Sequence, residues 1–343
     1  MNRAVLKKCL QEAFLLWGAC ALALFSFCWV RVYIVSRLEM SSFASIIEKL
    51  WDKVKDFSPV PLSQLLSYSG RIAVTYDEPI VVLCISIFAI ARGSDAISGE
   101  INRGTMELLL AQPVSRLQAL YSQAVVTVTG LVLLALISWC GVWCGIHTFS
   151  VKEDVPIKTF KIPGLPVEIP TQMPIPTKVL QIPFLLVPIP LEFKEAEKIR
   201  VPMSQRVNAD DIFPGAFNLA CLGICLAGIS TLVSAFDRYR WRTIGLVTGF
   251  YVVQMVCKIL GMAIKEVGWL RQLSIFTPYE PQKFIAAAVH APQDAWSIAL
   301  YDSAGRFLEP GPLGYNLILL VLGLGCYAAA GLVFHKRDLP APL

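Results

Sequence analysis

The sequence has little charge: only 16% of its 343 residues are Asp, Glu, Lys or Arg. The shortage is concentrated in six stretches that cover more than a third of the chain and contain no charged side chain at all. These stretches are residues 13–30, 79–91, 117–146, 212–236, 243–257 and 312–334. The 30 basic and 25 acidic residues all lie outside them. Such segregation excludes a set of soluble domains and indicates a polytopic membrane protein.

Other absences exclude classes of chemistry. Only three histidines occur, His147, His290 and His335, and there is no His-Glu-x-x-His motif or paired carboxylate in a span, so the sequence does not predict an enzyme. No Gly-x-x-x-x-Gly-Lys-Ser/Thr motif is present to hold nucleotide phosphates. The long polar loops contain no cysteine, which excludes a disulfide framework there. No dense basic run with interleaved aromatics occurs, so no nucleic-acid partner is expected.

The apolar stretches predict six membrane-spanning helices, because lipid offers no partner for an unpaired backbone amide. The 79–91 stretch reaches full length only by extending into its charged flanks. The 243–257 stretch does so only by continuing past Lys258 to Ile264, and we expect the lysine ammonium to snorkel to the interface. The first stretch follows three basic residues but is long for a signal peptide and lacks a small-x-small cleavage site, so it predicts a retained span.

Six spans place both termini on one side of the membrane. Basic residues are dense around the termini and in the short segments 92–116 and 237–242. The opposite side has more of them in total, but they are spread over long loops, which contribute little to orientation. The sequence therefore predicts a multi-pass protein of the inner (plasma) membrane with both termini in the cytoplasm.

This topology divides the chain into five parts. They are a cytoplasmic interfacial helix (1–12), spans one to three (13–147) with an outer loop (36–77) and a cytoplasmic segment (92–116), a proline-rich extracytoplasmic insertion (148–211), spans four to six (212–334) with an outer loop (265–311), and a cytoplasmic tail (335–343).

The outer pieces have distinct patterns. Residues 42–55 carry apolar side chains at helical spacing and predict an amphipathic helix. Ten prolines lie within residues 156–202, so that segment can form extended edge strands or polyproline-like runs but not a helix or a central strand. It can serve as a rigid spacer over the outer mouth or as a docking arm for an extracytoplasmic partner. A short apolar helix is expected after Pro281, placed where it can dip back into the membrane.

The cytoplasmic segment predicts a short helix between two spans. Gly104 ends the preceding helix, Thr105 can cap a new one, and Glu107 complements its positive end. Pro113 stops that helix after about two turns, and Ser115 with Gln118 forms a capping box that opens the third span.

Two interpretations of the role of this short helix stay open. Its apolar side chains, Met106, Leu109 and Leu110, are available for burial. It can be a membrane-surface helix that only links two spans, or a knob that fits a groove on a cytoplasmic partner.

The same segment carries a family resemblance. Asp95-Ala-Ile-Ser-Gly-Glu100, Gly104-Thr105, Glu107-Leu-Leu-Leu110 and Pro113-Val-Ser-Arg116 resemble the signature of ABC-2 type permeases, the membrane subunits of one class of ATP-binding-cassette transporters. The order of the six spans, the basic N-terminal helix and the ending at residues 334–340 resemble that family too. Within it, the chain is most similar to the short permeases typified by the nitrous-oxide-reductase maturation system.

The resemblance implies an all-α permease subunit that pairs with a second permease, identical or different, and with two copies of a separate cytoplasmic ATPase. It implies export driven by ATP on that ATPase, with no cofactor bound by this chain. The helix at 104–113 would be the coupling helix that seats in the ATPase. The ATPase-coupling residues carried over by position are Asp95, Glu100, Gly104, Thr105, Glu107, Leu109, Leu110, Pro113 and Arg116. The proline-rich insertion is longer than the resemblance leads one to expect, so no substrate is carried over.

Three alternatives stay open. A non-transporting scaffold or passive channel would use the charges of residues 95–100 only as solvated loop groups. Gly-x-x-x-Gly motifs at 141–145 and 245–249 allow close helix approach either within one subunit or between two. Cysteine pairs spaced four apart, at 140 and 144 with His147 nearby and at 221 and 225, suit soft metal ions, but buried structural cysteines explain them equally simply, so no metal is predicted.

Overall fold

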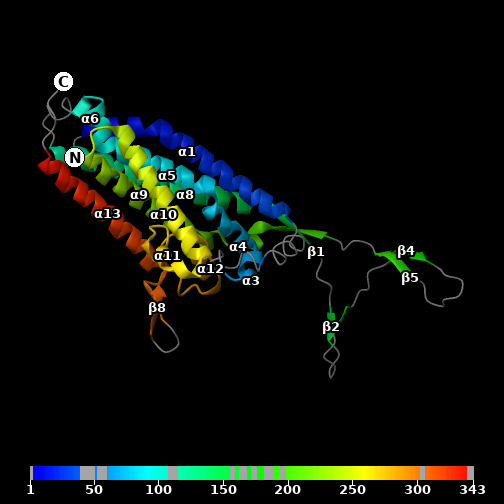
Figure 1. Ribbon diagram of the computed structural model, residues 1–343. Coiled ribbons are helices and arrows are strands. Elements are labelled where there is room, and N and C mark those ends of the chain that lie inside the picture. Colours follow the sequence, from blue (N-terminus) through cyan, green and yellow to red (C-terminus); the bar gives the residue numbers. More distant parts are fainter. Residues whose placement is uncertain are drawn as a thin grey trace.

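The computed structural model describes residues 3–38, 51, 60–106, 115–154, 159–161, 168–170, 176–180, 189–193, 198–301 and 306–337. Over this part of the chain, six helical segments are long and apolar enough to cross a membrane. They form one elongated bundle, with small helices and hairpins gathered at one end (Figure 1). The prediction of an all-α polytopic protein with six spans is confirmed.

Each span is built from one or more helical pieces. The first is α1 (Arg3–Arg37), the third α8 (Arg116–Thr148), the fourth α9 (Phe213–Phe236) preceded by a 3-10 turn (Ala209–Ile212), the fifth α10 (Arg240–Ala263) and the sixth α13 (Pro312–Lys336). The second comprises α4 (Tyr68–Ala73), the 3-10 turn η2 (Val74–Asp77), α5 (Pro79–Ser94), the π turn η3 (Asp95–Gly99) and α6 (Glu100–Asn102). The second and fifth spans thus extend past their charge-free stretches, as predicted.

The structure adds two details to the predicted first and fifth spans. The helix α1 runs without a break from Arg3, so the N-terminal basic segment and the first span form a single rod. The Lys258 Nζ donates to the carbonyls of Phe276 at 2.9 Å and Tyr279 at 2.8 Å, so the outer loop supplies its hydrogen bonds, and its position at the membrane interface stays a prediction.

The central helix of the bundle is α9, which contacts α5, α8, α12 and α13. Its backbone approaches α13 very closely: a Cβ on Gly228 would lie 2.2 Å from the carbonyl oxygen of Gly323. Glycines at both positions are therefore needed for this helix pair to pack at its observed separation.

The two Gly-x-x-x-Gly motifs differ sharply in their surroundings. On α8, a Cβ at Gly141 would lie 2.8 Å from the Phe25 carbonyl oxygen, and one at Gly145 would lie 2.7 Å from the Val32 Cβ, so this motif packs against α1 of the same chain. On α10, a Cβ at Gly245 or Gly249 would meet no atom within 4 Å. The α10 motif is therefore open on the surface of the bundle.

The opposite end from the chain termini carries the loops (Figure 1). It holds α3 (Leu62–Leu66), α11 (Trp269–Leu273), α12 (Pro281–His290) and a hairpin of β7 (Ala299–Tyr301) with β8 (Phe307–Pro310). The short helix expected after Pro281 is α12, and it packs on α4 and α9. The amphipathic helix expected at 42–55 lies outside the described residues except for one position.

The described residues of the proline-rich insertion between 150 and 202 form extended strands, as the composition predicts. Its described strands make three separate two-stranded antiparallel ladders, each strand with one partner. They are β1 (Ser150–Asp154) with β6 (Lys198–Pro202), β2 (Thr159–Lys161) with β3 (Glu168–Pro170), and β4 (Pro176–Leu180) with β5 (Ile189–Phe193). The β1–β6 ladder continues directly from α8 and anchors the insertion to the bundle.

Candidate functional site

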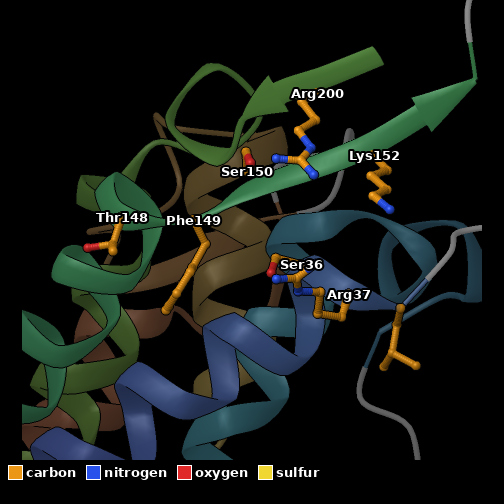
Figure 2. A pocket seen from close by; sticks show the side chains of 8 residues that line it. Ser36, Arg37, Thr148, Phe149, Ser150, Lys152 and Arg200 are labelled. Atoms are coloured by element: carbon orange, nitrogen blue, oxygen red, sulfur yellow. The ribbon is translucent and has the colours of Figure 1, made fainter. Parts of the chain in front are cut away.

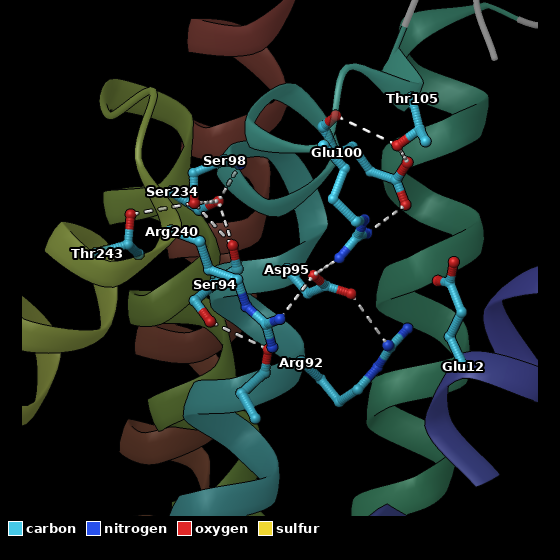
Figure 3. A network of polar contacts seen from close by, with 12 residues as sticks. Glu12, Arg92, Ser94, Asp95, Ser98, Glu100, Thr105, Ser234, Arg240 and Thr243 are labelled. Carbon is cyan, nitrogen blue, oxygen red and sulfur yellow. Dashed lines mark hydrogen bonds and ion pairs between the residues drawn. The ribbon is translucent and has the colours of Figure 1, made fainter. Parts of the chain in front are cut away.

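The candidate site is a network of charged and hydroxyl side chains at the end of the bundle where α1 begins and α13 ends (Figures 1 and 3). It is organised by the π turn η3, which interrupts the second span. A π turn shifts the hydrogen-bond register of a helix by one residue and frees backbone groups for other partners, and such turns occur frequently at functional sites.

The first anion of the network is Asp95, which is 4% exposed. Its carboxylate accepts from Arg103 Nη1 at 2.7 Å and pairs with Arg92 Nη1 and Arg240 Nη1, each at 3.4 Å. Arg92 comes from the same span as Asp95, Arg103 is the residue that follows that span, and Arg240 is the first residue of α10. Asp95 therefore ties the end of the second span to the start of the fifth.

The second anion is Glu100, which is 1% exposed. Lys8 Nζ donates to both of its carboxylate oxygens, at 2.8 and 2.9 Å, and Arg103 Nη2 lies 3.0 Å from Oε1. Thr105 Oγ1 donates to Oε2 at 2.5 Å. Glu100 thus joins α1 to the second span and to the first residues of the chain segment that follows it.

Arg103 bridges the two carboxylates, since one of its terminal nitrogens faces Asp95 and the other faces Glu100. Partial burial acts to lower the pKa of Arg103, but its hydrogen bond and charge pairing with Asp95 outweigh that effect and raise the pKa above its usual value. The planar guanidinium suits this role because it presents two donors in a fixed fork.

A hydroxyl cluster holds the backbone of the π turn. Ser234 Oγ, on α9, accepts from the amides of Ile97 at 3.2 Å and Ser98 at 2.8 Å. The Ser98 hydroxyl donates to the Ser94 carbonyl at 2.7 Å and lies 3.1 Å from Thr243 Oγ1 on α10. The turn is therefore fixed to α9 and α10 by hydrogen bonds as well as by ion pairs (Figure 3).

Two glycines shape the turn. A Cβ on Gly99 would lie 2.2 Å from Asp95 Oδ1, so only glycine leaves room for the carboxylate. Gly104 has φ +70°, a left-handed conformation that ends the helix with little cost for glycine. The prediction that Gly104 breaks the helix agrees with this geometry.

Thr105 was expected to cap the next helix through its side chain. The amides that it would cap lie outside the described residues, so that role stays a prediction; in the structure its hydroxyl donates to the carboxylate and the carbonyl of Glu100. A buried carboxylate attracts the hydroxyl proton more strongly than a neutral backbone group does, since hydrogen bonds to ionised acceptors are stronger. Thr105 therefore belongs to the ion-pair network.

Four of the predicted coupling residues lie outside the described residues: Glu107, Leu109, Leu110 and Pro113. The helix expected there therefore stays a prediction. Met106 is buried against Ile97, Leu120 and Phe334, among others, which agrees with the expected burial of this side chain.

The other end of the segment is described. Ser115 and Gln118 form the predicted capping box at the start of α8. Arg116 lies apart from the ion-pair network: its Nη1 donates to the Arg337 carbonyl at 2.6 Å. Arg337 Nη1 in turn donates to the carbonyls of Ala235 and Asp237. Through Arg337, Arg116 therefore links the start of α8 to the ends of α9 and α13.

Sequence reasoning missed five partners that the structure brings to this site: Lys8, Arg92, Arg103, Ser234 and Arg240. Local spacing carries a signal for two of them, because Arg92 with Asp95 and Glu100 with Arg103 are i,i+3 pairs on a helix. The other three come from α1, α9 and α10, and no local pattern marks them.

The arrangement suits a mechanical role better than bond-making chemistry. No group of three or more His, Cys, Asp and Glu side chains in the described residues can hold a metal ion. The cations meet the buried carboxylates from three spans, and charge-assisted hydrogen bonds of this kind are strong and directional. Glu100 therefore connects the network to α1, and Asp95 connects it to α10, with Arg103 bridging the two carboxylates.

The polar groups inside the spans serve helix packing within the chain. Asn218 Nδ2 donates to Asn316 Oδ1 at 2.7 Å, and Ser230 Oγ donates to the Ile90 carbonyl at 3.1 Å. Gln254 Oε1 accepts from the Ile275 amide at 3.0 Å. Asn218 and Ser230 are thus turned toward neighbouring helices of the same chain, and Gln254 toward the loop that follows α11.

Comparison with known proteins identifies one family. The model of a family described as "ABC-2 family transporter protein" matches residues 16–339. No curated protein and no solved structure matches the chain.

Proposed function

This chain belongs to the ABC-2 family of transporter proteins, and from that membership we propose that it is the permease subunit of an ATP-driven exporter whose coupling runs through the Asp95 and Glu100 network. The family match and the six apolar helices make it a multi-pass membrane protein of a transporter. The single observation that carries the coupling proposal is Glu100, a buried carboxylate contacted from α1, from its own span and from Thr105.

The site fits the entry point of a mechanical signal. The helix at 104–113 would be the coupling helix that seats in a cytoplasmic ATPase, and Thr105 and Met106 belong to its described part. Both of these residues are held by the bundle: Thr105 through Glu100, and Met106 through its buried side chain. A shift of the coupling helix would therefore pull on the end of the second span.

The network would pass this shift to two more spans. Glu100 is bonded to Lys8 on α1, and Asp95 is paired with Arg240 on α10. When two ATPase subunits close on ATP, the coupling helix would move, and α1, α5 and α10 would tilt together between inward and outward openings. No nucleotide site is expected in this chain, so the ATP would bind to the partner subunits.

A second permease subunit completes the proposed assembly. Asn218, Ser230 and Gln254 each form hydrogen bonds within one chain, and the path would lie between two subunits rather than inside one bundle. The helix α10 has only Thr243 and Val247 buried, and its Gly245 and Gly249 face open space. We place the second subunit against this face, with both termini and the network on the cytoplasmic side of the inner (plasma) membrane.

A helix-breaking substitution tests the coupling proposal. In Leu109→Pro, the proline ring and the missing amide would disrupt the short helix proposed at 104–113. We expect copurification with the ATPase subunit expressed alongside to fall at least about tenfold, since an interface that loses its central element loses several kcal/mol. Leu109→Met keeps the volume and helix propensity at the same position and should copurify normally.

The alternatives give different results in the same assay. A scaffold or a passive channel that needs no ATPase would show equal recovery of the ATPase with Leu109→Pro and Leu109→Met. Reconstituted complexes with the unmodified chain should hydrolyse ATP faster in the presence of a transported compound, and that stimulation should vanish with Leu109→Pro. Undiminished stimulation in the variant would show that the helix at 104–113 is not the coupling element.

A further inference from the structure

A polar pocket lies at the opposite end of the bundle from the ion-pair network. It has a volume of about 280 Å³ and is formed where α1 and α8 end and the proline-rich insertion begins (Figure 2). Its lining residues are Ser36, Arg37, Leu38, Thr148, Phe149, Ser150, Lys152 and Arg200. Three of these are cations and none is an acid, so the pocket has a strong positive charge.

The strand register places two of the cations directly opposite each other. In the antiparallel β1–β6 ladder, Lys152 is paired with Arg200, and the neighbouring pair Val151 and Val201 points to the other face, where Val151 is buried. Like charges directly opposite in a ladder are destabilising.

The third cation comes from the first span. Arg37 is the last residue of α1, and its guanidinium lies over the Tyr33 ring, 5.1 Å from the ring centroid. Figure 2 shows Lys152 and Arg200 projecting from the strands toward the end of α1, where Ser36 and Arg37 lie. Within the described part of the chain, no carboxylate pairs with any of the three cations.

The hydroxyls of the pocket are not equally available. Ser36 Oγ donates to the Tyr33 carbonyl at 2.7 Å, and Thr148 Oγ1 donates to the Cys144 carbonyl at 2.6 Å, so both serve their own helices. Ser150 lies on the same face of β1 as Lys152. The donors that face the pocket are therefore three cationic groups and one serine hydroxyl, a set that fits an anion with several oxygen atoms.

The position and the volume of the pocket limit which ligands can bind there. The 35 residues of α1 measure about 52 Å along the helix axis, which exceeds the roughly 30 Å hydrocarbon core, so the end of α1 reaches the headgroup region. The volume is at the lower limit of ligand sites, roughly 300 to 1,000 Å³. This space suits a phosphate-bearing headgroup or small ester and is too small for a whole lipid.

We propose that this pocket binds a phosphate-bearing group at the membrane surface opposite the ion-pair network, supplied by an anionic phospholipid headgroup or by a water-soluble phosphate ester. The bound phosphate would separate Lys152 from Arg200 and connect both to Arg37. It would thereby tie the base of the proline-rich insertion to the first span.

The test uses the full-length chain purified in detergent and titrated with phosphatidylglycerol, with phosphatidylcholine as the reference lipid, under native mass spectrometry. A parallel titration with glycerol 1-phosphate follows the midpoint of thermal unfolding. We expect Lys152→Gln/Arg200→Gln to raise the Kd for the phosphate ligand about 30-fold, since two membrane-surface cations are removed. Lys265→Gln/Arg306→Gln, which removes two exposed cations outside the pocket, should bind like the unmodified chain.

The two arms identify the source of the phosphate. Tight binding of phosphatidylglycerol alone assigns the site to lipid, and stabilisation by glycerol 1-phosphate assigns it to a soluble ester. The proposal is overturned if the unmodified chain prefers neither ligand to phosphatidylcholine, or if the double variant binds as well as the unmodified chain.

The unfolding temperature of the Lys152→Gln/Arg200→Gln variant shows whether weaker binding comes from the lost cations or from misfolding. If Lys152 and Arg200 repel each other in the empty pocket, the double variant should unfold in lipid-free detergent at the same temperature as the unmodified chain or at a higher one. An unfolding temperature clearly below that of the unmodified chain would show that these side chains are structural, and would overturn the ligand assignment.

Discussion

Replacing Lys8 by methionine should destabilise the protein by about 2 to 3 kcal/mol and should uncouple ATP hydrolysis from transport. The methionine keeps most of the side-chain volume but leaves Glu100, which is 1% exposed, without its closest cation. We expect less than the full cost of breaking a buried pair, because Arg103 and Thr105 still contact the carboxylate. The measurement is the free energy of unfolding of the purified chain, together with transport by the reconstituted complex.

A double-mutant cycle separates the pair from the rest of the network. Glu100→Gln removes the buried charge but keeps the shape and one of the two acceptor oxygens, and Lys8, whose side chain is 36% exposed, can then turn to Glu12 or to water. Glu100→Gln should therefore cost less than Lys8→Met. In the combined variant, part of the Lys8→Met loss should be recovered, with a coupling energy of about 1 to 2 kcal/mol.

Two results would contradict the assigned role. Purely additive effects in the cycle would mean that Lys8 and Glu100 do not support each other. If Lys8→Met is destabilised but its ATP hydrolysis still drives transport normally, the pair stabilises the fold without carrying the signal from the ATPase. Lys336→Met removes an exposed cation at the same end of the bundle and should change neither stability nor transport.

The spans were predictable from the sequence because their cause is local. A stretch that must satisfy its own backbone in lipid has to be helical and apolar, and both properties can be read residue by residue. The same holds for the capping box at Ser115 and for the helix break at Gly104, since each depends on side chains within one turn. The extended form of the insertion follows from proline alone.

The network was only half predictable because its other half depends on tertiary placement. Asp95 and Glu100 stood out in a motif, but Lys8 precedes Glu100 by 92 positions, and no spacing rule links them. The π turn was not predicted either, since a polar hydroxyl on another helix, Ser234, takes up the amides that it frees. An ionisable residue at the end of a span requires a partner, but the sequence does not say which one.

The Gly-x-x-x-Gly motifs show the same limit in a form that leads to a prediction. From sequence the motifs at 141–145 and 245–249 are equivalent, and only the structure separates a motif packed against α1 from one that faces outward. We expect Gly245→Leu/Gly249→Leu to abolish association of two differently tagged copies of this chain in detergent and to abolish transport. The new side chains would prevent the close approach of two α10 helices that small residues permit.

The same substitutions in the packed motif on α8 serve as the matched control, and their expected effect on the stability of the subunit is the opposite. Gly245→Leu/Gly249→Leu should leave the isolated subunit as stable as before or slightly more stable, because a Cβ at either site meets nothing within 4 Å and leucine is the better helix former. Gly141→Leu/Gly145→Leu should instead destabilise the subunit by several kcal/mol, since its side chains would collide with Phe25 and Val32 of α1. Retained association in the α10 variant, measured by copurification and by the mass of the complex, would remove α10 from the subunit interface and leave its open face to lipid.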